Sequence, residues 1–440
     1  MAVRFANHAT ASTVTSTSTA TSSTRGHSLR LPDGAGAGPP NSGPSEKVSV
    51  VAKRASLVRI AEPMLSRRTL LLASPVCLVL ALTACGGGAE PDPGPTETEL
   101  AAVAQAPGVG RERLAMEFGD LFDGEEGLGE TRAAIVMHRG EIVAERYAPE
   151  YGADTRFISW SMAKTVTAVM VGMLVADGAL ELDAPAPIAR WQRPGDARAE
   201  ITLRHLLQMR SGLDHTEGGE VPYESSEVRM LFLDQRDDMA KFAEEQPLEA
   251  EPGEKFEYSS NTTVILADIA ADVLTDGSGD PDSRRDAVDT YLRTRLFGPL
   301  GMTSMVPEYD AAGTLIGGSA IHATARDWAR FGEFLRNKGS YRGTQLVPRK
   351  WVEFMLEPSP PAPFYGGQTW LNTQASDPQN QLYPIDKPEG VFAAIGHMGQ
   401  YIVVSPKQRL TVVRLGHSNA EQRRALLRQI NDVVELYPTE

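Results

Sequence analysis

The sequence has very few cysteines, two in 440 residues, which excludes a disulfide scaffold and a cysteine-rich metal site. It also lacks an excess of positive charge, because 43 lysines and arginines stand against 57 acidic residues, a net charge of −14. Binding to phosphates requires clustered basic side chains, so this balance argues against a nucleic-acid partner. With 41% hydrophobic and 23% charged residues, the composition excludes a wholly disordered chain.

Several catalytic and metal-binding motifs are absent as well. The chain has no Gly-x-Ser-x-Gly, the turn that carries the nucleophile of α/β-hydrolases. It has no His-Glu-x-x-His, Cys-x-x-Cys or phosphate-binding loop, and His215 with Glu217 is too weak a pattern for a metal site. We therefore expect no metal and no cofactor.

The first 63 residues show no hydrophobic period and are rich in Thr, Ser, Ala, Gly and Pro. Such a segment buries too little apolar surface to offset the entropy of ordering it, so disorder is predicted for residues 1–63. A signal comes next, with paired arginines at 67 and 68, an apolar run from Leu70 to Leu82, and then Thr83-Ala84-Cys85. A run of thirteen residues is short for a membrane-spanning helix and typical of a signal peptide.

The end of this signal resembles a bacterial lipobox, in which the cysteine, here Cys85, becomes lipidated. The paired arginines resemble the export signal of proteins that are exported folded. Residues 64–85 are thus predicted to be a lipoprotein signal peptide, and the protein an exported bacterial lipoprotein on the periplasmic or extracellular side of a membrane. An ordinary signal peptide and a membrane anchor are the alternatives. Since a signal peptide begins a chain, we expect translation to start at Met64, which would leave residues 1–63 untranslated.

The negative charge is concentrated in the residues after the signal. Residues 86–440 hold 34 basic and 54 acidic residues, a net charge of −20, which disfavours strongly anionic substrates. Residues 86–110 are expected to form a tether, because 90–98 are rich in proline, acidic and hydroxyl residues. Residues 111–440 are expected to form one folded domain.

Hydrophobic periodicity predicts strands near both ends of this domain and helices between them. Apolar and polar residues alternate in 133–137 and 141–147, around Arg139-Gly140, and a second β-rich pair covers 401–405 and 410–415. The segment from Met162 to Ala176 is apolar almost all round and indicates a buried helix, and further helices are predicted at 262–274 and 421–436. The pattern favours an α+β fold, with an antiparallel sheet built from both termini, flanked by helices, and an inserted mainly helical region.

One short motif is suited to nucleophilic catalysis. Ser161-Met162-Ala163-Lys164 is a Ser-x-x-Lys that opens the most apolar helix, so both side chains lie on one helix face. The helix N-terminus offers free backbone N–H groups for a developing oxyanion. Burial would lower the pKa of Lys164, and the neutral amine could then accept the Ser161 proton. The alternative is that Ser161 only caps the helix and Lys164 reaches solvent.

Two further segments supply candidate partners. Tyr258, in Tyr258-Ser259-Ser260, precedes a predicted helix and could act as a third proton carrier. Gly396-His397-Met398-Gly399-Gln400 enters a strand, where a backbone N–H could complete an oxyanion hole with the N–H of Ser161.

These segments and their order resemble the serine β-lactamase-like hydrolases: class C β-lactamases, D-Ala-D-Ala carboxypeptidases and esterases of the same fold. The sequence is most similar to the branch that contains 6-aminohexanoate-dimer hydrolase. The resemblance runs from about Thr131 to Leu415 and rests on these motifs in order: Phe157–Thr165, Ile201–Leu207 with Ser211-Gly212-Leu213, Tyr258-Ser259-Ser260, Leu296–Met302, Ala323–Trp328 and Gly396–Tyr401.

The resemblance implies a role for each matching residue. Ser161 would be the acylated nucleophile and Lys164 would activate it. Tyr258 would serve as general base and then as general acid. The backbone N–H groups of Ser161 and Gln400 would form the oxyanion hole. The implied activity is cleavage of an amide or ester bond in a small molecule.

The sequence departs from the β-lactamase pattern at two positions that bear on the substrate. Ser260 stands where β-lactamases of this fold carry the Asn of Tyr-x-Asn, and His397-Met398-Gly399 stands where they carry Lys-Thr-Gly. A mostly neutral His397 holds a substrate carboxylate less well than a lysine does. The sequence therefore favours ester or amide substrates over β-lactams.

Two other functions remain open on the sequence. A β-lactamase or D-Ala-D-Ala carboxypeptidase is the alternative within the enzymes, and a non-catalytic envelope binding protein is the alternative outside them. The residues expected to contact substrate are Ser260, His397, Gly399, Tyr223 and Trp370.

Overall fold

The computed structural model describes residues 94–219, 221–373, 382 and 388–440. The predicted disordered segment, the signal peptide and the lipidation site at Cys85 lie outside the described residues. Among the helices of the described ranges, none has both the length and the apolarity needed to cross a bilayer.

A six-stranded antiparallel sheet is built from both ends of the domain, as the sequence predicts. Its strands are β1 (Glu130–His138), β2 (Glu141–Tyr147), β8 (Trp370–Leu371), β9 (Phe392–Gly396), β10 (Gln400–Ser405) and β11 (Leu410–His417). The order across the sheet is β2-β1-β11-β10-β9-β8, so β1 and β11, from opposite ends of the domain, lie side by side within it. The two predicted hairpins are confirmed as β1–β2 and β10–β11.

Helices cover both faces of this sheet, and for that reason its strands are almost continuously apolar. Along β1, Ala134 and Val136 face α2 (Arg111–Asp123) and α13 (Ala420–Glu435), while Ala133, Ile135 and Met137 join the larger core on the opposite face. That larger core contains α11 (Ala325–Arg336) and α4 (Met162–Ala176). Side chains of a strand alternate between the two faces, so one apolar run serves both cores.

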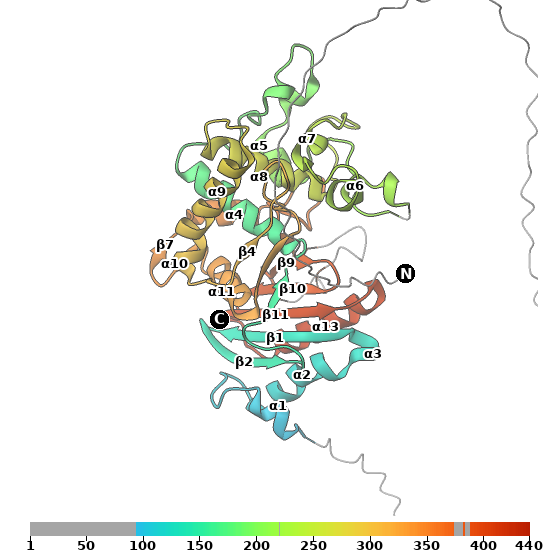
Figure 1. Cartoon of the computed structure of the whole chain (residues 1–440). Coiled ribbons are helices and arrows are strands. Elements are labelled where there is room, and N and C mark those ends of the chain that lie inside the picture. Colours follow the sequence, from blue (N-terminus) through green and yellow to red (C-terminus); the bar gives the residue numbers. More distant parts are fainter. Residues whose placement is uncertain (1–93, 220, 374–381, 383–387) are drawn as a thin grey trace, which may run out of the picture. The chain divides into compact units, whose positions relative to one another are not determined.

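The inserted region is mainly helical and lies above the sheet in Figure 1. Its helix α8 (Ser260–Leu274) packs against α4, and both are buried along most of their length. A small three-stranded sheet of order β3-β5-β4 leads into α4. The other elements are α3 (Glu125–Leu128), β3 (Arg156–Ile158), α5 (Leu203–Leu207), α6 (Ser226–Phe232), α7 (Met239–Glu244), α9 (Pro281–Leu292), α10 (Gly298–Leu300), β4 (Val306–Pro307), β5 (Ile321–Thr324), β6 (Ser340–Tyr341), β7 (Thr344–Gln345) and α12 (Arg349–Met355).

The folded unit begins earlier than the expected tether allows. Helix α1 (Glu97–Ala101) starts with a capping box between Thr96 and Glu99, and Val103 is buried and bridges to Ala144 of β2. The prediction that residues up to 110 form a tether is therefore wrong for this part of the segment. The proline-rich composition of the segment concealed its apolar residues: Val103 is buried in the core beside β2, and Leu100, Ala102 and Val109 pack against the same core.

Candidate active site

Ser161 lies where β3 and a tight turn lead into α4. It occupies the N-cap position, but its side chain makes no capping hydrogen bond. The preceding residue, Trp160, has φ +45°, a left-handed conformation that costs a bulky residue about 1–2 kcal/mol. The alternative that the Ser161 hydroxyl only caps the helix is therefore wrong.

Lys164 is buried one helical turn further along α4, with 1% of its surface exposed. Its Nζ lies 2.9 Å from Ser161 Oγ, 2.8 Å from Ser260 Oγ and 3.0 Å from the carbonyl oxygen of Gly318. The lysine therefore points into the protein and contacts the serine hydroxyl, instead of reaching solvent.

The protonation of Lys164 differs from the sequence-based expectation. Burial by itself lowers the pKa of the amine, but Tyr258, Glu217 and Glu227 outweigh it, so the pKa of Lys164 is raised. The expectation of a lysine neutralised by burial is wrong, because Tyr258, together with two carboxyl groups that the sequence did not place beside it, favours the ammonium form.

Tyr258 completes the cluster around Lys164. Its ring centroid lies 4.8 Å from Lys164 Nζ, and Tyr258 lines the same pocket as Ser161. Burial raises the pKa of Tyr258, although the charge of Lys164 opposes the shift. Burial therefore favours the neutral phenol of Tyr258, while the charge of Lys164 favours its phenolate.

These groups open into a pocket of about 440 Å³. Of the residues expected at the site, Ser161, Tyr258, His397 and Trp370 line it. The remaining lining residues are Trp160, Glu217, Gly218, Glu227, Val228, Phe232, Ser319, Ile395, Gly396 and Arg423. Ser260 lies beneath the pocket, fully buried, where it contacts Lys164. Burial and the charge of Arg423 lower the pKa of His397, so its ring is neutral at pH 7.

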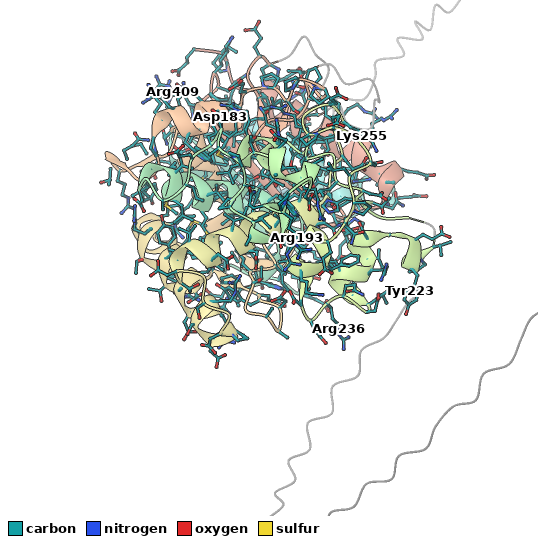
Figure 2. All side chains as sticks on the ribbon, turned by 90° about the horizontal axis from the view of Figure 1, so that it is seen from above. Asp183, Arg193, Tyr223, Arg236, Lys255 and Arg409 are labelled. Atoms are coloured by element: carbon teal, nitrogen blue, oxygen red, sulfur yellow. The ribbon has the colours of Figure 1, made fainter. Side chains whose placement is uncertain are left out.

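Three expected residues are not brought into the pocket. Tyr223 is 66% exposed at the edge of the molecule, as Figure 2 shows, because it lies on a surface turn, Pro222–Glu224. Gly399 faces Arg414, to which its carbonyl oxygen is hydrogen-bonded. Gln400 begins β10, one strand further from Ser161 than β9, and its side chain binds backbone groups of His397 and Gly416.

The end of β9 borders the pocket in place of Gln400. A Cβ atom on Gly396 would lie 2.2 Å from the carbonyl oxygen of Ser159, so only glycine allows β9 to approach the turn before Ser161. This close approach serves contact between two segments of the protein, whereas the sequence suggested room for a substrate backbone. Trp160 and His397 meet edge to face across it, with ring centroids 5.4 Å apart.

Glu217 and Glu227 are site residues that the sequence did not reveal. Glu217 Oε1 lies 3.6 Å from Lys164 Nζ, and Glu227 accepts a hydrogen bond of 2.9 Å from the Gly218 N–H. Burial, followed by the charge of Glu217, raises the pKa of Glu227 to about 7. No sequence pattern marks either residue, because a loop and the short helix α6 bring them to α8. His215, two residues before Glu217, is buried elsewhere and contacts Thr262 and the Ala243 carbonyl oxygen.

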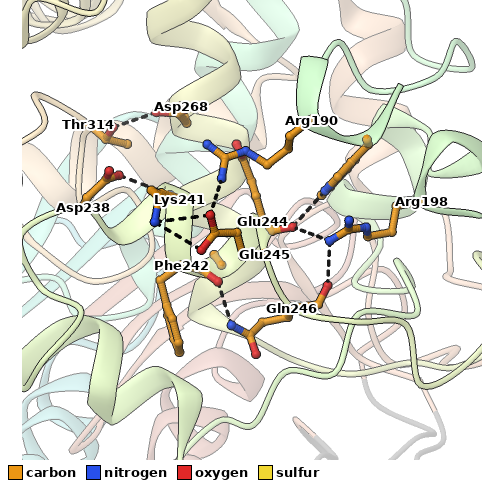
Figure 3. A network of polar contacts seen from close by, with 12 residues as sticks. Arg190, Arg198, Asp238, Lys241, Phe242, Glu244, Glu245, Gln246, Asp268 and Thr314 are labelled. Atoms are coloured by element: carbon orange, nitrogen blue, oxygen red, sulfur yellow. Dashed lines mark hydrogen bonds and ion pairs between the residues drawn. The ribbon is translucent and has the colours of Figure 1, made fainter. Parts of the chain in front are cut away.

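A larger groove of about 820 Å³ lies among charged residues of the helical region, away from Ser161. Figure 3 shows how its charges pair: Arg190 binds Glu244 at 2.7 Å and Glu245 at 3.2 Å, and Lys241 binds Glu245 at 3.2 Å. The two ion pairs of Arg190 connect the end of α7 to the segment before α5. We therefore assign these charged residues a structural role. Within the described ranges, no group of three or more acidic, histidine or cysteine residues could hold a metal ion.

The fold and this site agree with a family comparison in which residues 129–435 match the profile of the family named Beta-lactamase. The chain belongs to the Beta-lactamase family. It is a hydrolase of that family, and the match covers the whole sheet and the helical insertion.

Relatives within the family agree on hydrolysis and differ in substrate. The chain is 27% identical over 330 residues to the 6-aminohexanoate-dimer hydrolase of Paenarthrobacter ureafaciens, covering 71% of this chain and 79% of that protein. It is 32% identical over 213 residues to esterase EstB of Burkholderia gladioli, covering 43% of this chain and 50% of EstB.

Solved structures show the same fold. A Bacillus anthracis protein provisionally named a 6-aminohexanoate-dimer hydrolase superposes with a TM-score of 0.56 at 24% identity, covering 73% of this chain and 83% of that one. The octameric penicillin-binding protein homologue of Pyrococcus abyssi gives a TM-score of 0.50 at 19% identity, with 73% and 77% covered.

Proposed function

We propose that this protein is a serine hydrolase that cleaves an ester or amide bond through an acyl-enzyme on Ser161. The contact that carries the proposal is the 2.9 Å distance from Lys164 Nζ to Ser161 Oγ at the base of a pocket. A buried lysine that contacts a serine hydroxyl supplies the base that a serine nucleophile needs.

The reaction has two steps. Ser161 Oγ attacks the substrate carbonyl carbon and its proton passes to the amine form of Lys164. The alcohol or amine then leaves with a proton delivered through Tyr258, and the acyl group stays on Ser161. Water, deprotonated by the same pair of residues, attacks the acyl carbon and releases the acid. Because Lys164 rests as an ammonium, the reactive amine form becomes more abundant as the pH rises.

Backbone N–H groups stabilise the oxyanion. Ser161 begins α4, where the first N–H groups of a helix have no partner within it. The second donor is proposed at Gly396–His397, because these residues line the pocket and Gln400 does not.

The substrate is proposed to be a small ester or amide. Phe232, Trp160 and Trp370 give the pocket aromatic walls, and Glu217 and Glu227 make one side acidic. Arg423 also lines the pocket, so the pocket offers charges of both signs, which suits a small amide that carries an amine and a carboxylate as well as a neutral ester. The names of the two curated relatives, a dimer hydrolase acting on 6-aminohexanoate and an esterase, agree with this choice.

We also propose that the protein is an exported bacterial lipoprotein, anchored by a lipid on Cys85. The support is the lipobox-like Leu82-Thr83-Ala84-Cys85 after an apolar run and paired arginines. Metabolic labelling with a fatty-acid analogue tests the anchor, and persistence of the label in a Cys85→Ser variant would contradict it.

Mass spectrometry after treatment with a fluorophosphonate tests the catalytic assignment. We expect a single adduct on Ser161, together with turnover of a p-nitrophenyl ester or an aminohexanoate dimer. Faster turnover of a chromogenic cephalosporin would instead identify a β-lactamase. An unlabelled Ser161 without turnover of any of the three substrates would identify a binding protein.

A further inference from the structure

Glu217 binds the residue that stands between it and Lys164. Its Oε2 accepts a hydrogen bond of 2.6 Å from the Ser260 N–H, and its Oε1 accepts one of 2.8 Å from the Ser260 hydroxyl. An ionised carboxylate only accepts hydrogen bonds, so the hydroxyl proton of Ser260 points at Glu217. The lone pairs of Ser260 Oγ are thereby left for Lys164, whose Nζ lies 2.8 Å away.

This fixed direction determines how Lys164 uses its hydrogens. The carbonyl oxygen of Gly318, 3.0 Å away, only accepts, and Ser260 Oγ is held as an acceptor by Glu217. Two N–H groups of the lysine therefore donate hydrogen bonds, one to Ser260 Oγ and one to the carbonyl oxygen of Gly318. When Lys164 is a neutral amine, its lone pair occupies the third position, which faces Ser161 Oγ at 2.9 Å.

We propose that Glu217 is a positioning residue for catalysis, which acts through the Ser260 hydroxyl to direct the Lys164 lone pair at Ser161. This inference rests on the proposed function, in which Ser161 is the nucleophile. Glu217 need not touch the reacting atoms to play this part.

The proposal explains how the chain functions with Ser260 at its position. An asparagine there, the residue that β-lactamases of this fold carry, would offer Lys164 an amide oxygen that only accepts. A lone serine hydroxyl rotates freely and can equally donate to the amine, which would turn the lone pair away from Ser161. Ser260 and Glu217 together therefore supply the fixed acceptor that a single asparagine supplies elsewhere.

A simple counter-ion role for Glu217 makes a different prediction. The titratable and charged groups around it are Lys164 on α4, Tyr258 before α8, Glu227 on α6, His397 after β9 and Arg423 on α13. A counter-ion only raises the pKa of Lys164, so its removal would move the rise of activity to lower pH and leave the high-pH plateau unchanged. Loss of positioning lowers the plateau itself.

The experiment measures kcat and KM for a p-nitrophenyl ester across pH in the full chain. In Glu217→Gln, which keeps the volume, the amide can donate to Ser260 and reverse its hydrogen bond. We expect the high-pH plateau of kcat to fall about 100-fold, with KM changed by less than about threefold. Glu224→Gln is the matched control, because Glu224 is an exposed acid on the neighbouring turn. It should leave both constants unchanged.

A double variant separates positioning from mere support of the loop. Glu217→Ala makes room for a longer side chain at Ser260, and adding Ser260→Asn restores an amide oxygen that accepts directly from Lys164. We expect this addition to recover about tenfold or more of the lost kcat, as one hydrogen bond to a charged group implies. A supporting role would show no recovery.

The outcomes distinguish this inference from the function on which it rests. A wild-type protein without a fluorophosphonate adduct on Ser161 overturns the proposed function and the positioning role with it. A labelled wild type whose Glu217→Gln variant keeps the wild-type plateau overturns the positioning role alone.

Discussion

At the scale of single residues, Lys164 decides how the site works. Burial opposes its charge, yet neighbouring carboxyl groups hold it as an ammonium and three oxygen atoms surround its Nζ. The motif Ser161-x-x-Lys164 was legible in the sequence because i and i+3 share a helix face. The sequence did not predict that Glu217 and Glu227 belong to the site, because their distance to Lys164 depends on how a loop folds over α8.

Substitution of the proposed catalytic side chains should remove activity and leave the fold intact. We expect Ser161→Ala to lower kcat by about 10⁴-fold or more and Tyr258→Phe by about 10²- to 10⁴-fold. The phenylalanine keeps the ring contacts of Tyr258 with Trp370 and Tyr365. Ester hydrolysis and thermal unfolding, measured side by side, check both variants. Normal turnover in either variant would remove that residue from the mechanism.

The raised pKa of Lys164 predicts an alkaline activity profile. A base works only after losing its proton, so kcat/KM should still be rising with pH above 7. Glu227→Gln removes one charge that favours the ammonium, and we expect the rise to move to lower pH. Measurement of kcat/KM for a neutral ester at a series of pH values gives the profiles of the wild type and of the variant. A profile that is flat between pH 6 and pH 9 would show that Lys164 is not the titrating base.

At the scale of elements, the site forms where β9 meets the turn before α4. The sequence predicted the helix at Met162–Ala176 with its bounds and the strand at 401–405, but it did not predict β9, which ends at Gly396. It assigned the second oxyanion donor to Gln400, which does not line the pocket, because the number of residues in the β9–β10 turn is not fixed by the motif. The hairpin register pairs Gln400 with Gly396 and leaves only the end of β9 beside Ser161.

A methyl group on Gly396 should separate β9 from the nucleophile turn. Its Cβ would lie 2.2 Å from the Ser159 carbonyl oxygen, so Gly396→Ala is expected to cost about 1–3 kcal/mol and to lower kcat. Gly152→Ala is the control, because no atom lies within 4 Å of the added Cβ. Urea unfolding and ester hydrolysis test the pair. Equal behaviour of the two variants would mean that the close approach is not needed.

At the scale of the whole molecule, the acidic composition creates buried carboxyl groups in the helical region. Burial, followed by the charge of Asp268, raises the pKa of Glu244 to about 8 even though Arg190 lies 2.7 Å away. Part of the net charge therefore depends on pH near neutrality, which the amino-acid counts alone do not reveal.

Stability should decrease as the pH rises from 6.5 to 8. The folded state holds the Glu244 proton up to about pH 8 while the unfolded chain loses it near 4.5, so deprotonation disfavours folding by about 1–2 kcal/mol over this interval. Burial lowers the pKa values of His205 and His215 to about 4, so these two residues change the stability only below pH 6.5. Urea unfolding at both pH values measures the change, and Glu244→Gln should remove the larger part of it, because Glu227, whose pKa is raised to about 7, contributes the rest. An equal decrease in the variant would assign the effect to other groups.

The sequence by itself determined the fold class, both hairpins, the buried helix and the adjacency of Ser161 and Lys164, because each results from hydrophobic periodicity or from spacing within one helix. Only the tertiary structure decided which distant residues join them. It placed Glu217 and Glu227 at Lys164, kept Tyr223 on the surface and put the end of β9 in the pocket wall. Those outcomes depend on loop paths and strand register, which no local pattern fixes, and the charge state of Lys164 depends on them in turn.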